Sequence, residues 1–319
     1  MILYLFSIYI TRKEKRSARS WYAEQLLMFR IKKGIFTYSD NPEIFLARQA
    51  IENEKRYELP VALRLIGKIQ RIDFAGLDCF VLGGGSTSLR ILYLHGGAYV
   101  EQPMLPHWTF LDALGRKTGA EIIVPIYPKA PVHTYQQTFT LLTELYRLLL
   151  DICRPCDTVF MGDSAGGGLA LAFSQYCKEA SLPQPKELVL LSPWLDVSME
   201  NPKILPLQPK DPMLQRDHLA AMGKAWAGST DVHDWHVSPL YGDLTGLPPI
   251  TMFVGTHEIF LADAYTFQHR AQQQHVRIDM RVYPKMNHVF PLFPIPEAKR
   301  AMREIAEIVE RPALMPVSR

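Results

Sequence analysis

The sequence GDSAGG at residues 162–167 places Ser164 two residues away from a glycine on each side. A G-x-S-x-G pattern between a strand and a helix is typical of a serine nucleophile on a sharp turn, because side chains at the glycine positions would clash with their neighbours. The N–H group of Ala165 and the positive end of the following helix then face the reacting carbonyl. The pattern indicates nucleophilic acyl transfer, and the alternative is a glycine-rich turn without catalysis.

A serine nucleophile needs a base, and the base needs a carboxylate that orients it. His288 follows the last apolar run, IDMRVYP, and precedes a final helical stretch, so it is the predicted base. Glu258 comes directly after the run PITMFVG and is the predicted acid. Asp263 is the alternative acid, one helical turn further on. The order serine, acid, histidine is the chain order of the triad in α/β-hydrolases.

The segment His95-Gly96-Gly97-Ala98-Tyr99 follows the apolar run LRILYL. A histidine and two glycines in the loop after a strand, upstream of the serine, favour backbone N–H donors that bind an oxyanion. The sequence therefore predicts an oxyanion hole made by the N–H groups of Gly96, Gly97 and Ala165. His95 is expected to hold the loop rather than to move a proton.

A parallel sheet is the element that would position these residues. From residue 89 onward, short apolar runs alternate with helical stretches such as Tyr135–Leu150 and Ala165–Ala180. This alternation predicts an α/β fold with a mostly parallel sheet and helices on both faces. Residues 195–249 hold no convincing strand but do hold a helix candidate, Asp217–Trp226, and are predicted to be an insertion. In such folds ligands bind at the carboxyl ends of the strands, where the candidate residues lie.

Composition excludes several classes of protein. The chain has 319 residues and a net charge of +3, from 35 basic and 32 acidic residues, which argues against a dedicated nucleic-acid binder. Its 4 cysteines are too few for a disulfide framework and favour reduced thiols in a cytoplasm. The pair Cys153 and Cys156 lacks the further ligands that zinc needs. Neither a metal nor an organic cofactor is expected.

The first ten residues, MILYLFSIYI, are apolar except for Ser7 and precede a basic stretch. A helix of this length covers about 15 Å, half of a bilayer core, so a membrane span is not expected. A secretory signal is not expected either, because the charge follows the apolar stretch. Residues 1–16 are predicted to form a helix that packs on the protein. Peripheral membrane contact is the less favoured alternative to a purely cytoplasmic protein.

Taken together, the motifs resemble those of the hormone-sensitive-lipase-like family of α/β-hydrolase esterases. The resemblance covers about residues 70–310 and rests on HGGAY, IYPKAP, GDSAGG, SPLYGDLTGLPP and MNHVF. It implies an eight-stranded α/β-hydrolase core over residues 68–319. It also implies a cap made from the helical segment 1–67 and the insertion 195–249. Two residues depart from the family pattern: Ala98 replaces a third glycine, and Glu258 replaces the usual aspartate.

The predicted activity is that of a serine carboxylesterase or lipase acting on short- to medium-chain acyl esters, a small-molecule substrate. Three alternatives stay open: an amidase or deacetylase with the same triad, a non-catalytic ligand receptor, and a lipid-binding protein on the same fold. The substrate pocket is predicted between cap and core. Its candidate lining residues are apolar or aromatic: Trp21, Phe29, Tyr99, Trp194, Met213, Leu214 and Trp226.

Overall fold

The computed structural model describes residues 2–32, 41–60, 69–74, 76–84 and 87–312, and the elements below lie within them. The strands are β1 (Ile69–Phe74), β2 (Leu77–Gly83), β3 (Arg90–Leu94), β4 (Glu121–Pro125), β5 (Thr158–Asp163), β6 (Glu187–Leu191), β7 (Ile250–His257) and β8 (Ile278–Asn287). The α-helices are α1 (Ile2–Glu14), α2 (Ala18–Lys32), α3 (Pro42–Glu54), α4 (Leu105–Thr118), α5 (Tyr135–Ile152), α6 (Ala165–Glu179), α7 (Arg216–Ala227), α8 (Leu261–Gln273) and α9 (Pro296–Glu310).

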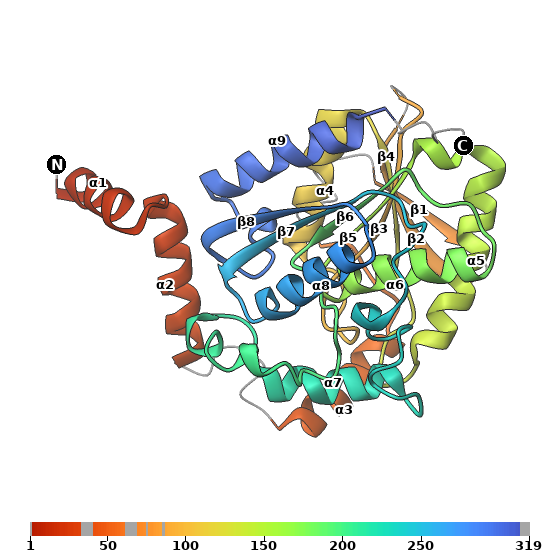
Figure 1. The fold of residues 1–319 in the computed structure, drawn as a ribbon, viewed down its shortest axis with the longest axis horizontal. Coiled ribbons are helices and arrows are strands. Elements are labelled where there is room, and N and C mark those ends of the chain that lie inside the picture. The colour runs from red at the N-terminus through yellow and green to blue at the C-terminus, as the bar shows by residue number, and fades with distance from the viewer. Residues whose placement is uncertain (1, 33–40, 61–68, 75, 85–86, 313–319) are drawn as a thin grey trace.

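The strands form one eight-stranded sheet in the order β1-β2-β4-β3-β5-β6-β7-β8. The hairpin β1–β2 is antiparallel and pairs with β4, while the strands from β4 to β8 run parallel (Figure 1). Continuous apolar runs build the central strands because both of their faces are covered, and every residue of β5 and β6 is buried. The predicted α/β-hydrolase architecture is confirmed.

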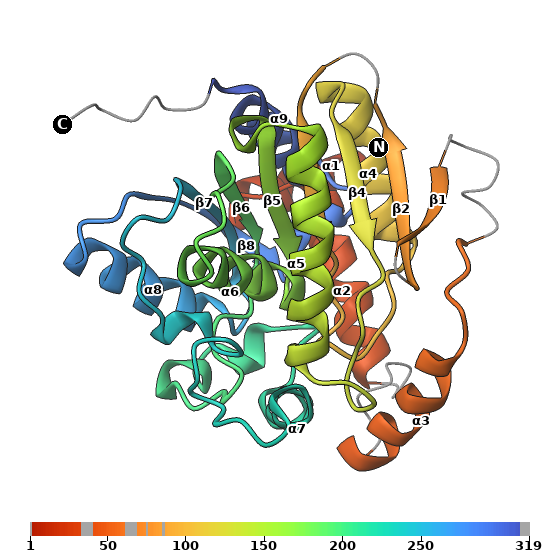
Figure 2. The same ribbon diagram turned by 90° about the vertical axis from the view of Figure 1, so that its right-hand side faces the viewer.

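Helices cover both faces of the sheet. One apolar layer joins α4 and α9 to residues such as Ile91 and Val159. The other layer joins α5, α6 and α8 to residues such as Leu92 and Phe160 (Figure 2). Neighbouring residues of β3 and β5 thus point into opposite layers, as the two-residue period of a strand requires. This double cover fixes the strand ends on which the candidate residues sit.

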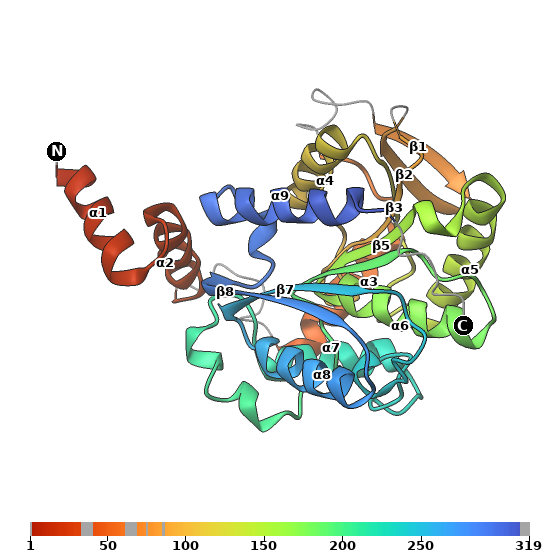
Figure 3. The ribbon, with the colours of Figure 1, turned by 45° about the horizontal axis from the view of Figure 1, so that its top comes forward.

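Further helices lie beyond the carboxyl ends of the strands. The helix expected at 217–226 is present as α7, within the segment between β6 and β7, and α3 packs against it. Helices α1 and α2 stand to one side of the sheet (Figure 3). The division into a cap segment, 1–67, and a core, 68–319, stays a prediction. Residues 1, 33–40 and 61–68 of that segment are outside the described residues.

Candidate active site

Ser164 lies on the turn between β5 and α6 with a φ angle of 54°, a left-handed conformation that is unusual for a serine. The glycines around it allow this turn. A Cβ atom on Gly162 would lie 2.3 Å from the carbonyl oxygen of Gly166, and one on Gly166 would lie 2.0 Å from that of Leu94. The strained turn therefore projects the hydroxyl from the carboxyl end of the sheet, at the start of a helix.

Ser164, His288 and Glu258 form one continuous hydrogen-bonded line. His288 Nε2 is 2.9 Å from Ser164 Oγ, and His288 Nδ1 is 2.8 Å from Glu258 Oε2. All three residues are buried, with exposed fractions of 8%, 3% and 0% for the serine, the histidine and the glutamate. The ring of Phe260 packs edge-on against His288, with 5.0 Å between the ring centroids. The imidazole is therefore held between a hydroxyl and a carboxylate in a largely dry environment.

The second oxygen of Glu258 is also fixed. Glu258 Oε1 accepts hydrogen bonds from Ser192 Oγ at 2.8 Å and from the N–H group of Gly255 at 2.5 Å. Ser192 Oγ in turn accepts from the N–H group of Val289, next to the histidine, at 3.0 Å. Ser192 therefore ties the loop of the acid to the loop of the base. Ser192 is not among the residues predicted from the sequence, where its only signal is its position after the run ELVLL.

Asp263, the alternative acid, is buried on α8 but has a different partner. Its Oδ1 accepts from Asn201 Nδ2 at 2.7 Å, and no hydrogen bond joins it to His288 in the described part of the chain. Burial raises the pKa of Asp263 to about 7, and Asn201 only partly offsets this. The geometry therefore places Glu258, and not Asp263, beside the imidazole.

A second buried network holds the loop after β3. Asp163 Oδ1 accepts from Tyr93 Oη at 2.6 Å and from the N–H group of Gly96 at 2.9 Å, and Asp163 Oδ2 is 3.2 Å from His107 Nε2. Burial alone would raise the pKa of Asp163, but His107 and these donors lower it. Because the Gly96 amide already has an acceptor, it is not available to an oxyanion, contrary to the expectation from the sequence.

His95 contacts the backbone of the loop for which it is predicted to be the support. Its Nδ1 lies 2.7 Å from the carbonyl oxygen of Gly96, and its ring stacks on Tyr127 with 4.4 Å between centroids. Tyr127 Oη also donates to the carbonyl oxygen of His95 at 2.7 Å. Burial keeps the pKa of His95 well below its usual range, so the ring stays neutral.

The insertion reaches the active site through Asp211. Its Oδ2 accepts from the N–H group of Ile259 at 2.9 Å, and its Oδ1 accepts from Met213 and Leu214 at 2.8 and 2.9 Å. Burial raises the pKa of Asp211 to about 6, and the nearby His288 and the three amides limit this rise. Asp211 therefore fastens the insertion to the residue that follows Glu258.

The seven candidate pocket residues do not gather in one place. Tyr99 stacks on Trp226 at 4.3 Å and on Trp194 at 5.5 Å, and all three rings are almost wholly buried. Met213 is partly buried against the same layer of the core. Trp21 and Phe29 lie on α2, where Phe29 is 54% exposed. Leu214 lines a cavity.

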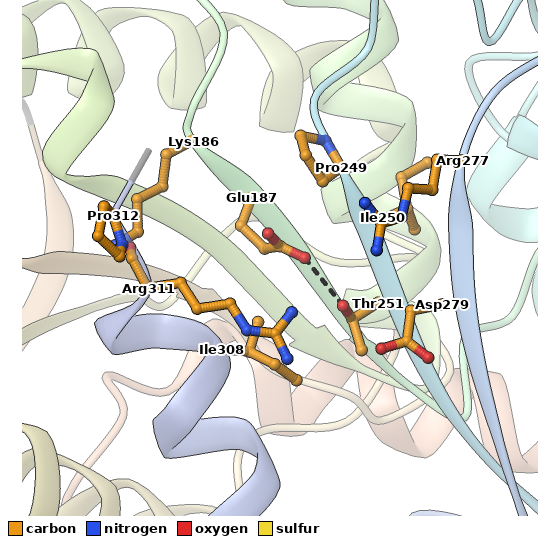
Figure 4. A pocket seen from close by; sticks show the side chains of 10 residues that line it. All are labelled: Lys186, Glu187, Pro249, Ile250, Thr251, Arg277, Asp279, Ile308, Arg311 and Pro312. Atoms are coloured by element: carbon orange, nitrogen blue, oxygen red, sulfur yellow. Dashed lines mark hydrogen bonds between the residues drawn. The ribbon is translucent and has the colours of Figure 1, made fainter. Parts of the chain in front are cut away.

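Two cavities lie at opposite ends of the sheet. The one in Figure 4, of about 260 Å³, lies at the amino ends of β6, β7 and β8, opposite to Ser164. The other, of about 490 Å³, lies between α2 and the insertion, and its apolar lining includes Met28, Leu205 and Leu214. Asp211 also lines it, so this second cavity adjoins the acid loop. The second cavity therefore lies at the same end of the sheet as Ser164, although neither Ser164 nor His288 is among its lining residues.

Comparison with known proteins places this site in a family. The family model described as the α/β-hydrolase fold matches residues 91–292, which include the serine, the acid and the histidine. The chain belongs to the α/β-hydrolase family. It is 34% identical over 227 residues to an esterase of Acinetobacter venetianus, covering 70% of this chain and 75% of that one. It is 32% identical to an acetyl-hydrolase of Streptomyces hygroscopicus, covering 66% and 72% of the two chains.

A solved structure extends the comparison to the predicted subfamily. A crystal structure of an esterase from the bacterial hormone-sensitive lipase family aligns with a TM-score of 0.78 and 27% identity, covering 91% of this α/β-hydrolase and 98% of that chain. The resemblance inferred from the sequence motifs is confirmed. Within the described residues, no group of three or more His, Cys, Asp or Glu side chains is arranged to hold a metal ion.

Proposed function

We propose that this α/β-hydrolase is a serine carboxylesterase that cleaves short- to medium-chain acyl esters. The observation that carries the proposal is the line from Ser164 through His288 to Glu258, with 2.9 and 2.8 Å between the joined atoms. The names of its relatives, an esterase and an acetyl-hydrolase, agree with this chemistry.

In the proposed reaction, His288 Nε2 takes the proton of Ser164 Oγ as that oxygen attacks the ester carbonyl. The imidazolium then protonates the leaving alcohol, and water hydrolyses the acyl-enzyme by the same route. Glu258 holds the Nδ1 proton and stabilises the charge on the ring. Because Oε1 is occupied by Ser192 and Gly255, Oε2 remains directed at the ring.

The oxyanion donors in this mechanism are the N–H groups of Gly97, Ala98 and Ala165. Gly97 and Ala98 donate to no acceptor within the described chain, and Ala165 opens α6, so its N–H group has no partner in the helix. Ala98 takes the place expected for Gly96, whose amide is bound to Asp163. Each such donor contributes about 3 kcal/mol to catalysis in comparable sites.

The substrate class follows from the cavity beside the acid loop. Its volume of about 490 Å³ falls in the range of small-molecule sites. Met28, Leu205 and Leu214 offer apolar contacts to an acyl chain, and polar side chains form the rest of the lining. Cleavage of an amide would use the same nucleophile. The assay must therefore compare cleavage of ester bonds with cleavage of amide bonds.

The test is a series of p-nitrophenyl esters of rising acyl length with matched anilides, combined with labelling by an organophosphonate. We expect turnover of the shorter esters, weak or no turnover of the anilides, and a label on Ser164. Ser164→Ala should abolish the label and lower kcat by about 10⁶-fold. Absence of both turnover and label in the wild-type protein would refute the proposal, and preferred cleavage of the anilides would replace it with an amidase.

A further inference from the structure

Helices α1 and α2 form an arm that extends from the body of the protein. We use "arm" for residues 2–32. In Figures 1 and 3, α1 stands well away from the sheet and from the helices that cover it. The sequence of its first nine residues, ILYLFSIYI, is apolar except for Ser7, and Tyr9 is 54% exposed. No helix among the described residues is long and apolar enough to cross a bilayer. Ile10, near the end of α1, is buried but belongs to neither apolar layer of the core. An apolar helix that stands away from these layers is suited to another apolar environment.

A basic segment follows this apolar helix. Residues 11–19 contain five basic residues and one acidic residue, a net charge of 5 − 1 = +4, while the whole chain has +3. The rest of the chain is therefore slightly acidic, and the positive charge is concentrated in the arm. Arg12, Lys13, Lys15 and Arg19 are exposed. This concentration selects a partner with negative charge.

The second helix adds an exposed apolar face. Tyr22, Leu26 and Phe29 follow one another at helical spacing and are 47%, 57% and 54% exposed. Apolar tip, basic segment and apolar face thus lie along one short arm. This combination is the pattern of a helix that lies in a membrane interface, where apolar residues enter the acyl region and cations meet anionic headgroups.

The root of the arm is fixed to the core close to the active site. Glu24 contacts both Arg16 and His257, and His257 is the residue before Glu258. Lys285 Nζ donates to Glu14 at 2.7 Å, and Ser17 Oγ donates to Glu297 at 2.8 Å. The arm is therefore tethered at its root by polar contacts. Next to this root, Met28 of α2 lines the cavity that adjoins the acid loop.

We propose that the arm binds the surface of an anionic phospholipid bilayer and holds the mouth of this cavity against lipid. The binding itself does not depend on catalysis, whereas the delivery of lipid esters rests on the proposed esterase function. A bilayer explains the apolar and the basic parts of the arm together. A soluble acidic protein would account for the charge but not for the apolar helix α1.

The first experiment measures cosedimentation of the full-length protein with two vesicle types: phosphatidylcholine alone, and phosphatidylcholine mixed with phosphatidylglycerol. We expect binding to the mixed vesicles at about 0.05 M salt, weaker binding to phosphatidylcholine, and loss of most of the difference at about 0.5 M salt. No binding to the mixed vesicles at low salt, or equal binding to both vesicle types, overturns the proposal.

The charge of the arm is tested by the triple variant Arg12→Glu, Lys13→Glu, Lys15→Glu. Each basic residue at an anionic surface strengthens binding by about fivefold, so the variant should bind roughly 100-fold more weakly. The matched control reverses three exposed cations elsewhere: Lys117→Glu, Arg147→Glu and Lys224→Glu. It makes the same change in net charge and should retain most of the binding. An equal loss in the control overturns the proposal.

The apolar part is tested by Tyr9→Ser with Leu26→Ser, which should also weaken vesicle binding at least tenfold with an unchanged melting temperature. If this variant binds as well as the wild type, the apolar arm is not inserted and the proposal fails. All variants should hydrolyse dissolved p-nitrophenyl acetate like the wild type, while cleavage of an ester embedded in anionic vesicles falls with binding. Vesicle binding by a protein without esterase activity would refute only the proposed function.

Discussion

Two buried histidine–carboxylate pairs flank Ser164, and only one of them reaches its hydroxyl. His288 lies 2.8 Å from Glu258, and His107 lies 3.2 Å from Asp163, which directly precedes the serine in the chain. Both carboxylates sit at carboxyl ends of strands, and both histidines are at least 95% buried. Burial and pairing are thus common to the two sites and do not distinguish a reactive histidine from a structural one.

The difference lies in the second nitrogen of each ring. His288 Nε2 is 2.9 Å from Ser164 Oγ, so this nitrogen can accept a proton from the nucleophile. His107 Nδ1 is instead occupied by the backbone of Met104, whose N–H group donates to it at 3.0 Å. Burial lowers the pKa of His107, but Asp163 reverses this and raises it overall. One pair can therefore move a proton, while the other holds the loop after β3.

The largest effect should come from changing the carboxylate of the reactive pair. In Glu258→Gln, the amide oxygen would accept the hydrogen bonds that Ser192 Oγ and the Gly255 N–H group donate to Oε1 in the wild type. The amide NH₂ group would then face His288 Nδ1. The ring would then carry its proton on Nε2 and could not accept one from Ser164. We expect kcat to fall by about 10⁴-fold, measured with a p-nitrophenyl ester.

Circular dichroism should show that the Glu258→Gln protein is folded. Glu258→Asp serves as the conservative control, because it keeps the charge but has a shorter side chain. It should retain more activity than Glu258→Gln. A loss below tenfold for Glu258→Gln would remove this residue from the triad.

A smaller effect is expected from the carboxylate of the structural pair. Asp163→Asn removes the negative charge of the carboxylate to which Tyr93, the Gly96 amide and His107 are hydrogen-bonded. The loop that carries the proposed oxyanion donors should then lose its fixed position. Since one oxyanion donor is worth about 10²–10³ in kcat, a loosened loop should cost about 10- to 100-fold.

The diagnostic for Asp163→Asn is the division between kcat and KM. KM should stay within about threefold while kcat falls, because the donors act mainly on the transition state. Tyr93→Phe is the matched control, since it removes one of the three donors and leaves the charge in place. Equal losses in the two variants would contradict an anchoring role for the carboxylate.

The fold and the reactive pair were predictable because their signals are local. Ser164 sits in a contiguous motif, and Glu258 was chosen over Asp263 because it comes sooner after the strand. The engagement of the Gly96 amide was not predictable, since its partner is Asp163, 67 residues away in the chain. The tight packing of Trp194 and Trp226 could not be predicted either. The sequence pattern around an aromatic residue is the same whether its side chain lines a pocket or fills a core.

The smallest effect on activity should come from the rejected acid. Asp263 is 1% exposed, and its Oδ2 has no hydrogen-bond partner among the described residues. Burial raises its pKa from 3.8 in the unfolded chain to about 7 in the folded protein. Between these values the folded state binds more protons than the unfolded state, so this group makes the free energy of unfolding fall as the pH rises from about 4 to about 7.

Asp263→Asn should remove that slope while leaving kcat within about threefold of the wild type, since Asp263 does not contact His288. Thermal unfolding at pH 5 and pH 8 measures the result: the wild-type protein should lose more stability between the two values than the variant does. The variant should be the more stable of the two proteins at pH 8, because an amide carries no charge to bury. A large loss of kcat would instead identify Asp263 as the triad acid. Glu258 would then be a structural carboxylate like Asp163.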